Sequence, residues 1–264
     1  MIRNALCHLL KPSLLVQTTL WSGDRSHPRL IPRLQQSKFL KESNPLFDEL
    51  IVIDDPMPCP GPLNMAIDEV ILNSGRPAIL RFYRWNKPTI SFGYFVTFAE
   101  ACAAAGDRVM VRRWTGGGIV PHGEDLTYSI MIGSNDETFS LPSKIVYQRV
   151  HAALGRALRE IGIATVLTEM NEPKLSEDCF ANPVVSDVIE NGKKIAGAAQ
   201  RKTRSGLLHQ GSIQRENLNG KFRSIFGKLL AKRLITNNIE MDILSAAEKL
   251  AAAKYATGAW LRRR

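Results

Sequence analysis

The chain has 264 residues, of which 44% are hydrophobic and 23% are charged, values typical of a globular protein. This composition excludes a disordered, collagen-like or coiled-coil protein, and no apolar run approaches the roughly 18 residues of a membrane span. The four cysteines, Cys7, Cys59, Cys102 and Cys179, show neither Cys-x-x-Cys nor zinc-finger spacing. They predict free thiols in a reducing compartment and no metal site.

The net charge of +10 is spread unevenly along the chain. Residues 1–41 carry seven Lys or Arg against one acid, and residues 201–264 carry fourteen against four. Residues 1–44 show no sustained periodicity, so we interpret them as a basic extension, either an organelle presequence or the product of an over-extended start codon. Residues 45–264 are expected to form the folded domain, with a basic helical C-terminal region that suits either solvent or an acidic partner.

Hydrophobic periodicity predicts helices and strands from residue 49 onward. The expected helices cover residues 62–73, 97–105, 143–161 and 241–257. The expected strands cover residues 49–54, 79–85, 89–93, 108–113, 125–132, 164–167, 184–189, 194–199 and 207–213. The dipeptide Asn191-Gly192 between two apolar runs predicts a tight hairpin. Consecutive strands with few helices favour an α+β fold, in which a mixed, mostly antiparallel sheet carries helices on one face.

The first candidate site is the segment 112–118 (RRWTGGG), which follows a predicted strand. Three consecutive glycines let backbone approach a ligand closely, and exposed N–H groups in such a loop form a concavity that fits an anion. Arg112 and Arg113 add charge that suits a phosphate or a carboxylate. The segment matches neither the Walker pattern nor the dinucleotide fingerprint, so a plain glycine turn is the alternative.

Lys194 opens a run of small residues and is the second candidate. On a strand, Lys194, Ala196 and Ala198 share one face, and the small side chains leave room for a ligand. The lysine is therefore either a cleft residue or an exposed hairpin lysine, and the pattern alone does not separate the two.

Three further side chains are candidates: Cys179, His122 and His209. A lone cysteine is more often a small buried hydrophobe than a nucleophile, and the neighbouring Glu177 and Asp178 would raise its pKa. Each histidine suits a turn or the core as well as a site, because the sequence shows no partner carboxylate for either one.

Four stretches, taken together and in this order, resemble the biotin/lipoate protein ligase and lipoyl/octanoyl transferase superfamily. They are residues 80–95 (LRFYRWNKPTISFGYF), 112–129 (RRWTGGGIVPHGEDLTYS), 192–200 (GKKIAGAAQ) and 207–213 (LLHQGSI). The resemblance covers about residues 49–215. It implies a mixed sheet flanked by helices, and a narrow tunnel for a lipoyl or octanoyl chain.

The resemblance also assigns roles to residues at matching positions. Lys194 corresponds to the family's lysine that contacts the acyl carbonyl or the adenylate phosphate, where a cation stabilises the developing oxyanion. The substrate-binding positions that we expect from the motifs are Arg112, Arg113, Thr115, Gly116, Gly117, Gly118, His122, Gly197, Ala198 and His209.

Two chemistries occur on this fold. A lipoate–protein ligase uses ATP and Mg²⁺ to form a lipoyl-adenylate, whereas an octanoyltransferase needs no cofactor and passes the acyl group through a cysteine thioester. Residues 179–200 look like the cysteine-dependent octanoyltransferases, with Cys179 about fifteen residues before Lys194. Gly118 points the other way, because octanoyltransferases tend to have an arginine as the third residue of the loop.

The hypothesis is therefore an octanoyltransferase with Cys179 and Lys194 as catalytic residues. The resemblance implies acyl carrier protein as donor and a lipoyl-domain acceptor, either the glycine-cleavage H protein or a dehydrogenase E2 subunit. The alternatives are an ATP-dependent lipoate–protein ligase, a biotin ligase and a non-catalytic lipoyl-binding homologue. We expect a cytoplasmic protein, with organelle targeting by residues 1–44 left open. A nucleic-acid partner is not expected, because the basic C-terminal region lacks interleaved aromatic residues; nor is a membrane.

Overall fold

A computed structural model describes residues 44–169, 183–216 and 218–263 of the chain. The strands are β1 (Phe47–Asp54), β2 (Ile79–Tyr83), β3 (Thr89–Phe92), β4 (Val109–Arg112), β5 (Ile119–His122), β6 (Leu126–Gly133), β7 (Val166–Leu167), β8 (Val188–Glu190), β9 (Lys193–Lys202), β10 (Gly206–Ile213) and β11 (Ala231–Asn237). The helices are α2 (Gly61–Asn73), α3 (Phe98–Ala105), α4 (Ser143–Glu160), α5 (Gly220–Leu230), α6 (Met241–Leu250) and α7 (Gly258–Leu261), with a 3₁₀ turn at Glu137–Ser140 and a π-helical turn at Ala251–Tyr255.

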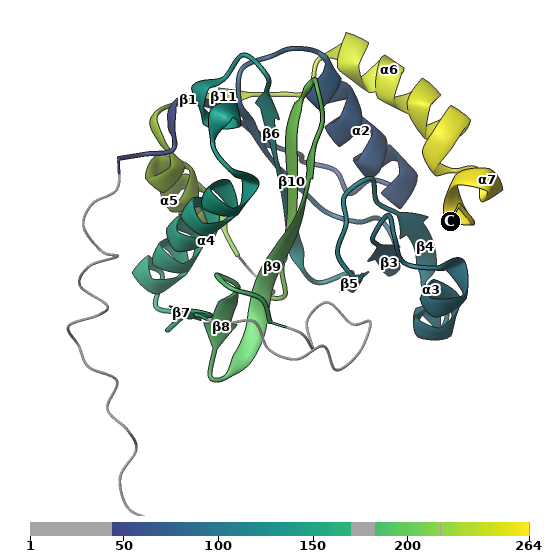
Figure 1. Ribbon diagram of the computed structural model, residues 1–264, viewed down its shortest axis with the longest axis horizontal. Helices are drawn as coiled ribbons and strands as arrows, with labels where there is room; N and C mark the ends of the chain where they lie inside the picture. The colour runs from purple at the N-terminus through teal and green to yellow at the C-terminus, as the bar shows by residue number, and fades with distance from the viewer. Residues whose placement is uncertain (1–43, 170–182, 217, 264) are drawn as a thin grey trace, which may run out of the picture. The chain divides into compact units, whose positions relative to one another are not determined.

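The larger sheet has the strand order β11-β1-β2-β6-β10-β9-β8-β7 (Figure 1). β1 pairs in parallel with both β2 and β11, and the other neighbours in this sheet are antiparallel. A smaller sheet has the order β4-β3-β5, with β3 parallel to β4 and antiparallel to β5. The prediction of a mixed, mostly antiparallel sheet in an α+β fold is confirmed.

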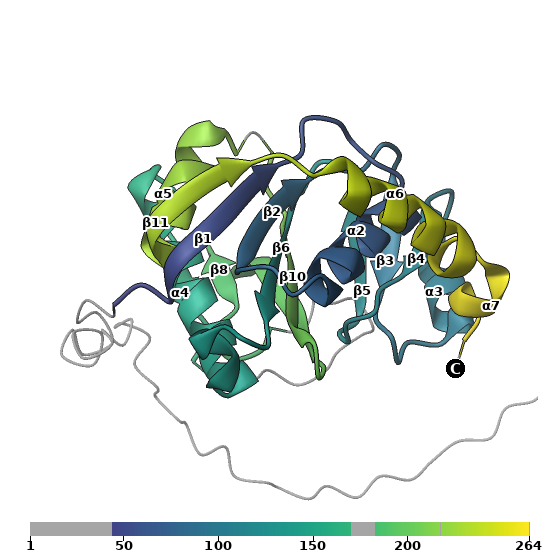
Figure 2. The same ribbon diagram turned by 90° about the horizontal axis from the view of Figure 1, so that it is seen from above.

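The expectation that helices lie on one face of the sheet was wrong. Helices α4 and α5 pack on one face and α2 and α6 on the other (Figure 2). Alternation along β2 shows why: Leu80 and Phe82 join the core beneath α4 and α5, while Ile79 and Tyr83 join the core beneath α2. Every residue of β2 and β6 is buried, and a strand that is apolar on both faces needs cover on both.

Local sequence signals explain most of the elements. Helix α4 places Val146, Val150 and Leu154 on one buried stripe, and the hairpin between β8 and β9 turns at Asn191 and Gly192, which both have positive φ as a two-residue turn requires. Strand β5, helix α5 and strand β11 were missed by the sequence interpretation. Throughout the described ranges, no helix is both long and apolar enough to cross a membrane.

Candidate functional site

A cavity of about 420 Å³, including its open mouth, lies between the two sheets and α2. Its walls combine apolar side chains from α2, β2 and β5 with polar groups from β3 and β9. Five of the residues expected from the sequence line it: Arg113, His122, Lys194, Gly197 and Ala198. The cavity therefore brings together the lysine segment of β9 and Arg113, near the start of the glycine-loop segment.

Lys194 is buried at the cavity wall and paired with a carboxylate that the sequence did not reveal. Its Nζ lies 2.8 Å from Asp187 Oδ2, and the two side chains are 3% and 0% exposed. Gly197 makes this conformation possible, because a Cβ there would lie 2.5 Å from Cε of Lys194. The small residues on β9 therefore make room for the lysine chain as well as for a ligand.

Asp187 is held from several sides. Tyr147 donates its hydroxyl to Oδ1 at 2.5 Å, and the backbone N–H of Val184 donates to Oδ2 at 2.7 Å. The Tyr147 hydroxyl also accepts from the backbone N–H of Ala198 at 3.2 Å. Burial, followed by the charge of Asp187, raises the pKa of Tyr147, so the phenol stays protonated and keeps donating. The lysine is therefore positioned by a fully formed polar network.

Two histidines lie behind this network. His151 Nδ1 donates to the carbonyl of Ser186 at 2.7 Å, and burial lowers the pKa of His151 to about 4. His209 lies against Tyr128, and its Nδ1 accepts a hydrogen bond from the side-chain amide of Gln200 at 3.0 Å. Burial lowers the pKa of His209 well below the usual value. Both rings are therefore neutral near pH 7, and His209 lies outside the cavity lining.

Because His151 is neutral in the folded state, acid should destabilise the protein. At His151 the unfolded chain takes up a proton below about pH 6.5 and the folded chain only near pH 4, so this residue alone should cost about 1.4 kcal/mol of unfolding free energy for each pH unit in that window. His209 adds to the loss in the same direction. The replacement His151→Asn keeps a donor for Ser186 and removes the titration. Urea unfolding between pH 7 and pH 4.5 should show a shallower acid loss for the variant; equal slopes would contradict the assignment.

The glycine loop is packed tightly against β3. A Cβ on Gly93 would lie 1.9 Å from the carbonyl oxygen of Gly117, so β3 can approach the loop only with glycine at this position. Gly117 itself has φ of +80°, which favours glycine. Thr115 is buried and donates its hydroxyl to Gln210 at 2.8 Å, which ties the loop to β10.

The two arginines of the loop segment have different environments. Arg113 lines the cavity and donates to the carbonyls of Gly116 and Gly118 at 3.0 and 2.9 Å. Arg112 is fully buried and donates to five backbone carbonyls, those of Gly93, Tyr94, Val96, Trp260 and Leu261. The contacts of Arg112 hold the loop segment to the C-terminal region, and it is not part of the cavity lining.

His122 has the partner carboxylate that the sequence did not show. Its Nδ1 lies 2.7 Å from Asp125 Oδ2, three residues further along the chain. Its Nε2 lies 2.6 Å from the hydroxyl of Ser91 on β3, and Trp85 stacks on its ring at 4.1 Å. The spacing His-x-x-Asp was visible in the sequence, but only the pairing of β3 with β5 brings Ser91 to the ring.

The candidate nucleophile Cys179 lies outside the described residues. Its role stays a prediction, together with the other site assignments made from the motifs. The site also includes residues that the sequence analysis did not name. Of these, Asp187 and Tyr147 surround the lysine, and Ser91 and Asp125 flank His122.

Comparison with known proteins agrees with this fold. Residues 60–246 match the family model described as the lipoyl protein ligase A/B catalytic domain. The chain belongs to this family, as the motifs predicted.

Individual relatives refine the comparison. Octanoyltransferase LipM of Oceanobacillus iheyensis is 38% identical over 162 residues, which cover 57% of this chain and 59% of that protein. LipM of Symbiobacterium thermophilum is 34% identical over 171 residues, which cover 58% and 61%. The matched part spans about three fifths of the length of these relatives. A solved bi-partite lipoate protein ligase from Thermoplasma acidophilum has the same fold, with a TM-score of 0.62 and 22% identity over 82% of this chain and 96% of that chain.

Proposed function

We propose that the protein transfers an octanoyl group to a lysine of a lipoyl-domain protein. The observation that carries the proposal is the buried Lys194 ammonium at the wall of a cavity with apolar sides, formed by Met65, Tyr83, Trp85 and Val120. Such a cavity suits a hydrocarbon chain, with a cation beside the carbonyl at its end. The octanoyltransferase relatives support transfer as the reaction.

The proposed reaction has two steps. In the first, the Cys179 thiolate attacks the octanoyl thioester of acyl carrier protein, the carbon–sulfur bond breaks and the carrier leaves as a thiolate, which takes a proton from water. In the second, the neutral amine of the acceptor lysine attacks the Cys179 thioester, the carbon–sulfur bond breaks and an amide forms. The amine gives its proton to the hydroxide left by the first step, and the Cys179 thiolate returns. In both steps a negative charge develops on the carbonyl oxygen, and Lys194 stabilises it. The acceptor proposed is the glycine-cleavage H protein or a dehydrogenase E2 subunit.

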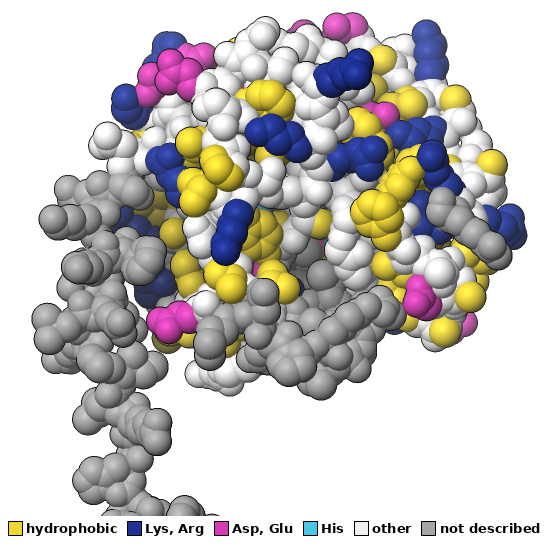
Figure 3. All heavy atoms as spheres, viewed as in Figure 1, with side chains coloured by type: hydrophobic (Ala, Val, Ile, Leu, Met, Phe, Trp, Pro, Cys, Tyr) yellow, Lys and Arg dark blue, Asp and Glu magenta, His cyan; other side chains and the backbone are white. Residues whose placement is uncertain are grey.

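The basic C-terminal side of the domain supports a protein substrate of acidic character. On the face shown in Figure 3, Lys and Arg side chains predominate over Asp and Glu. Arg201, Arg262 and Arg263 lie over the rings of Tyr94, Trp114, Phe98 and Trp260 at 4.7–5.5 Å. None of these three arginines has an ion-pair partner among the carboxylates of the described ranges.

The second candidate function is an ATP-dependent lipoate–protein ligase. Its support is the Gly116-Gly117-Gly118 loop, in which the third residue is glycine, together with the lipoate ligase among the solved neighbours. In this case ATP and Mg²⁺ would supply the activation step, and Arg113 with the glycine loop would hold the phosphate. We place either reaction in a reducing compartment such as the cytoplasm, because both Cys59 and Cys102 are free.

An experiment without ATP separates the two functions. The purified protein is mixed with octanoyl–acyl carrier protein and an apo lipoyl-domain acceptor, and the acceptor is weighed by mass spectrometry. We expect an octanoyl mass gain that the replacement Cys179→Ser abolishes, whereas Cys102→Ser, which changes an exposed thiol on α3, leaves it unchanged. Gain that requires ATP and free lipoate or octanoate, or full activity of Cys179→Ser, would favour the ligase.

A further inference from the structure

A serine and a histidine on the wall of the cavity lie in series with an aspartate behind them. Ser91 Oγ is 2.6 Å from His122 Nε2, and His122 Nδ1 is 2.7 Å from Asp125 Oδ2. Ser91 and His122 both line the cavity. These distances are those of a catalytic triad, in which a nucleophile is hydrogen-bonded to a base and a carboxylate orients that base. Such a triad is recognised by its geometry and not by the positions of its residues in the sequence.

Arg113 and Asp125 together set the direction of the protons in this series. A guanidinium can only donate, and Nη1 of Arg113 lies 2.7 Å from Ser91 Oγ, so the serine hydroxyl accepts there. The Asp125 carboxylate can only accept, so His122 donates to it from Nδ1. In the neutral ring Nε2 is then the acceptor, and the serine's own proton points to it. This is the proton arrangement that a serine nucleophile needs before attack.

The surroundings hold this arrangement and keep the carboxylate charged. Thr127 and Ser212 donate hydroxyls to the same Asp125 oxygen at 2.9 and 2.6 Å. Burial alone would raise the pKa of Asp125, but the interaction with His122 and the hydrogen bonds from His122, Ser212 and the backbone N–H of Gly123 lower it below the usual value. The ring of Trp85 stacks on the imidazole of His122 and restricts its rotation. The Arg113 guanidinium stabilises negative charge on Oγ.

We propose that Ser91 is an acyl-accepting nucleophile, and that the protein hydrolyses medium-chain acyl thioesters through Ser91, His122 and Asp125. The apolar part of the substrate follows from the cavity, because Met65 and Val120 give it apolar walls, and the medium chain length rests on the octanoyl group of the proposed function. Since Ser91 has no exposed surface, a substrate reaches it only through the cavity, and slow turnover is expected. The activity requires neither Cys179 nor an acceptor protein.

The chemistry balances with water as the only co-substrate. Ser91 Oγ attacks the thioester carbonyl while its proton moves to His122 Nε2; the carbon–sulfur bond breaks, and the leaving thiolate takes that proton. Water then attacks the Ser91 ester and gives a proton to Nε2. The carbon–oxygen bond to Ser91 breaks, the proton returns to Oγ, and a carboxylic acid leaves. Asp125 stays charged throughout and stabilises the imidazolium.

The test uses the full chain carrying Cys179→Ala, so that it is independent of the proposed transferase route. This parent protein is incubated with S-octanoyl-N-acetylcysteamine, and the release of octanoate is followed by mass spectrometry. Adding Ser91→Ala or His122→Ala to the parent should lower the rate at least about 10²-fold. Adding Ser140→Ala, which changes an exposed hydroxyl that only donates to the carbonyl of Glu137, should leave it unchanged.

A covalent probe keeps the proposal testable if a substitution prevents folding. The Cys179→Ala parent is treated with an alkyl fluorophosphonate, digested and mapped, and the phosphonate is expected on Ser91. No octanoate release by the parent, equal release by the Ser91→Ala variant, or a probe found on other residues would each overturn the proposal. The transferase proposal is judged separately, by octanoyl gain on the acceptor with Cys179 present.

Discussion

Replacing Lys194 with methionine should lower the rate of transfer to the acceptor lysine at least about 10²-fold, because the variant loses the cation beside the developing oxyanion. Methionine keeps most of the length of the side chain, so the cavity wall is preserved. The measurement is the initial rate of octanoyl gain on the acceptor, taken over a range of donor concentrations. Lys193→Met is the matched control, since Lys193 is exposed on the same strand and should keep full activity.

Loss of the lysine also leaves Asp187 buried without that partner, so Lys194→Met should lose about 3–5 kcal/mol of unfolding free energy. The double replacement Lys194→Met/Asp187→Asn removes both charges and should recover much of this stability without recovering transfer. This pair of results separates chemistry from folding. Normal transfer by the stable double variant would show that the Lys194 charge has no part in the reaction.

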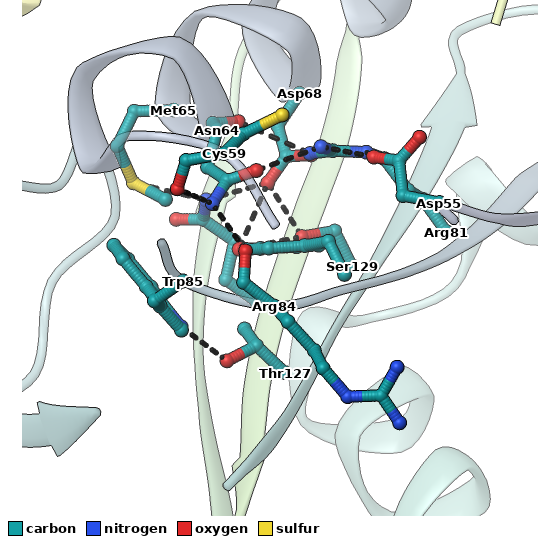
Figure 4. A network of polar contacts seen from close by, with 12 residues as sticks. Asp55, Cys59, Asn64, Met65, Asp68, Arg81, Arg84, Trp85, Thr127 and Ser129 are labelled. Atoms are coloured by element: carbon teal, nitrogen blue, oxygen red, sulfur yellow. Dashed lines mark hydrogen bonds and ion pairs between the residues drawn. The ribbon is translucent and has the colours of Figure 1, made fainter. Parts of the chain in front are cut away.

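The second large effect is expected at Arg81, which lies at the centre of a buried polar network (Figure 4). Its guanidinium donates to Asp68 at 2.9 Å and to Asp55 at 2.7 Å, and also to the side-chain oxygen of Asn64 at 2.8 Å. Burial alone would lower the pKa of Arg81, but the two carboxylates outweigh it and raise the pKa. The guanidinium is therefore firmly charged, and the two carboxylates depend on it.

We expect Arg81→Met to cost about 3–5 kcal/mol of unfolding free energy, because two carboxylates would lose their buried cation. Denaturant unfolding monitored by circular dichroism measures this. Arg84→Met is the matched control: Arg84 is exposed and Figure 4 shows its guanidinium pointing away from the network, so its loss should change stability by less than about 0.5 kcal/mol. Similar small losses for both variants would contradict the role given to the network.

The network reaches the functional site through shared partners. Gln210 donates to Asp68 at 2.8 Å, and its side-chain oxygen accepts from Thr115 at the start of the glycine loop. Ser129 donates to the same oxygen of Asp68 at 2.5 Å. Helix α2, strands β6 and β10 and the loop are therefore joined by consecutive hydrogen bonds beneath the cavity.

Much of the fold could be predicted because its local signals are strong. The apolar stripe of α4, the Asn191-Gly192 turn and the apolar runs of β2 and β6 each act over a few neighbouring residues. The helix and strand over residues 220–237 were harder to predict from the sequence. Phe222, Phe226 and Leu230 have helical spacing, but the chain passes directly from α5 into β11 with no glycine or proline between them, so no local signal marks the boundary.

The candidate site was predictable only in part, for a related reason. The motifs identify residues that lie close together in the sequence, such as Arg113 and the glycines, and Lys194 with Gly197. The partners that determine their behaviour come from distant segments: Tyr147 on α4 reaches Asp187, and Ser91 on β3 reaches His122. Strand pairing and helix packing create these contacts, and no spacing rule encodes them. The basic extension over residues 1–44 stays a prediction.

The attachment of Arg112 to Trp260 and Leu261 has a consequence for how the protein is made. Trp260 lies 148 positions after Arg112, and it both donates its indole N–H to the Arg112 carbonyl and accepts from the guanidinium. On the ribosome, β3, β4 and the glycine loop emerge long before these acceptors exist. A nascent chain therefore offers Arg112 the carbonyls of Gly93, Tyr94 and Val96, which are made before it, but not those of Trp260 and Leu261. The contacts that join the loop segment to α7 can form only after α7 has left the exit tunnel.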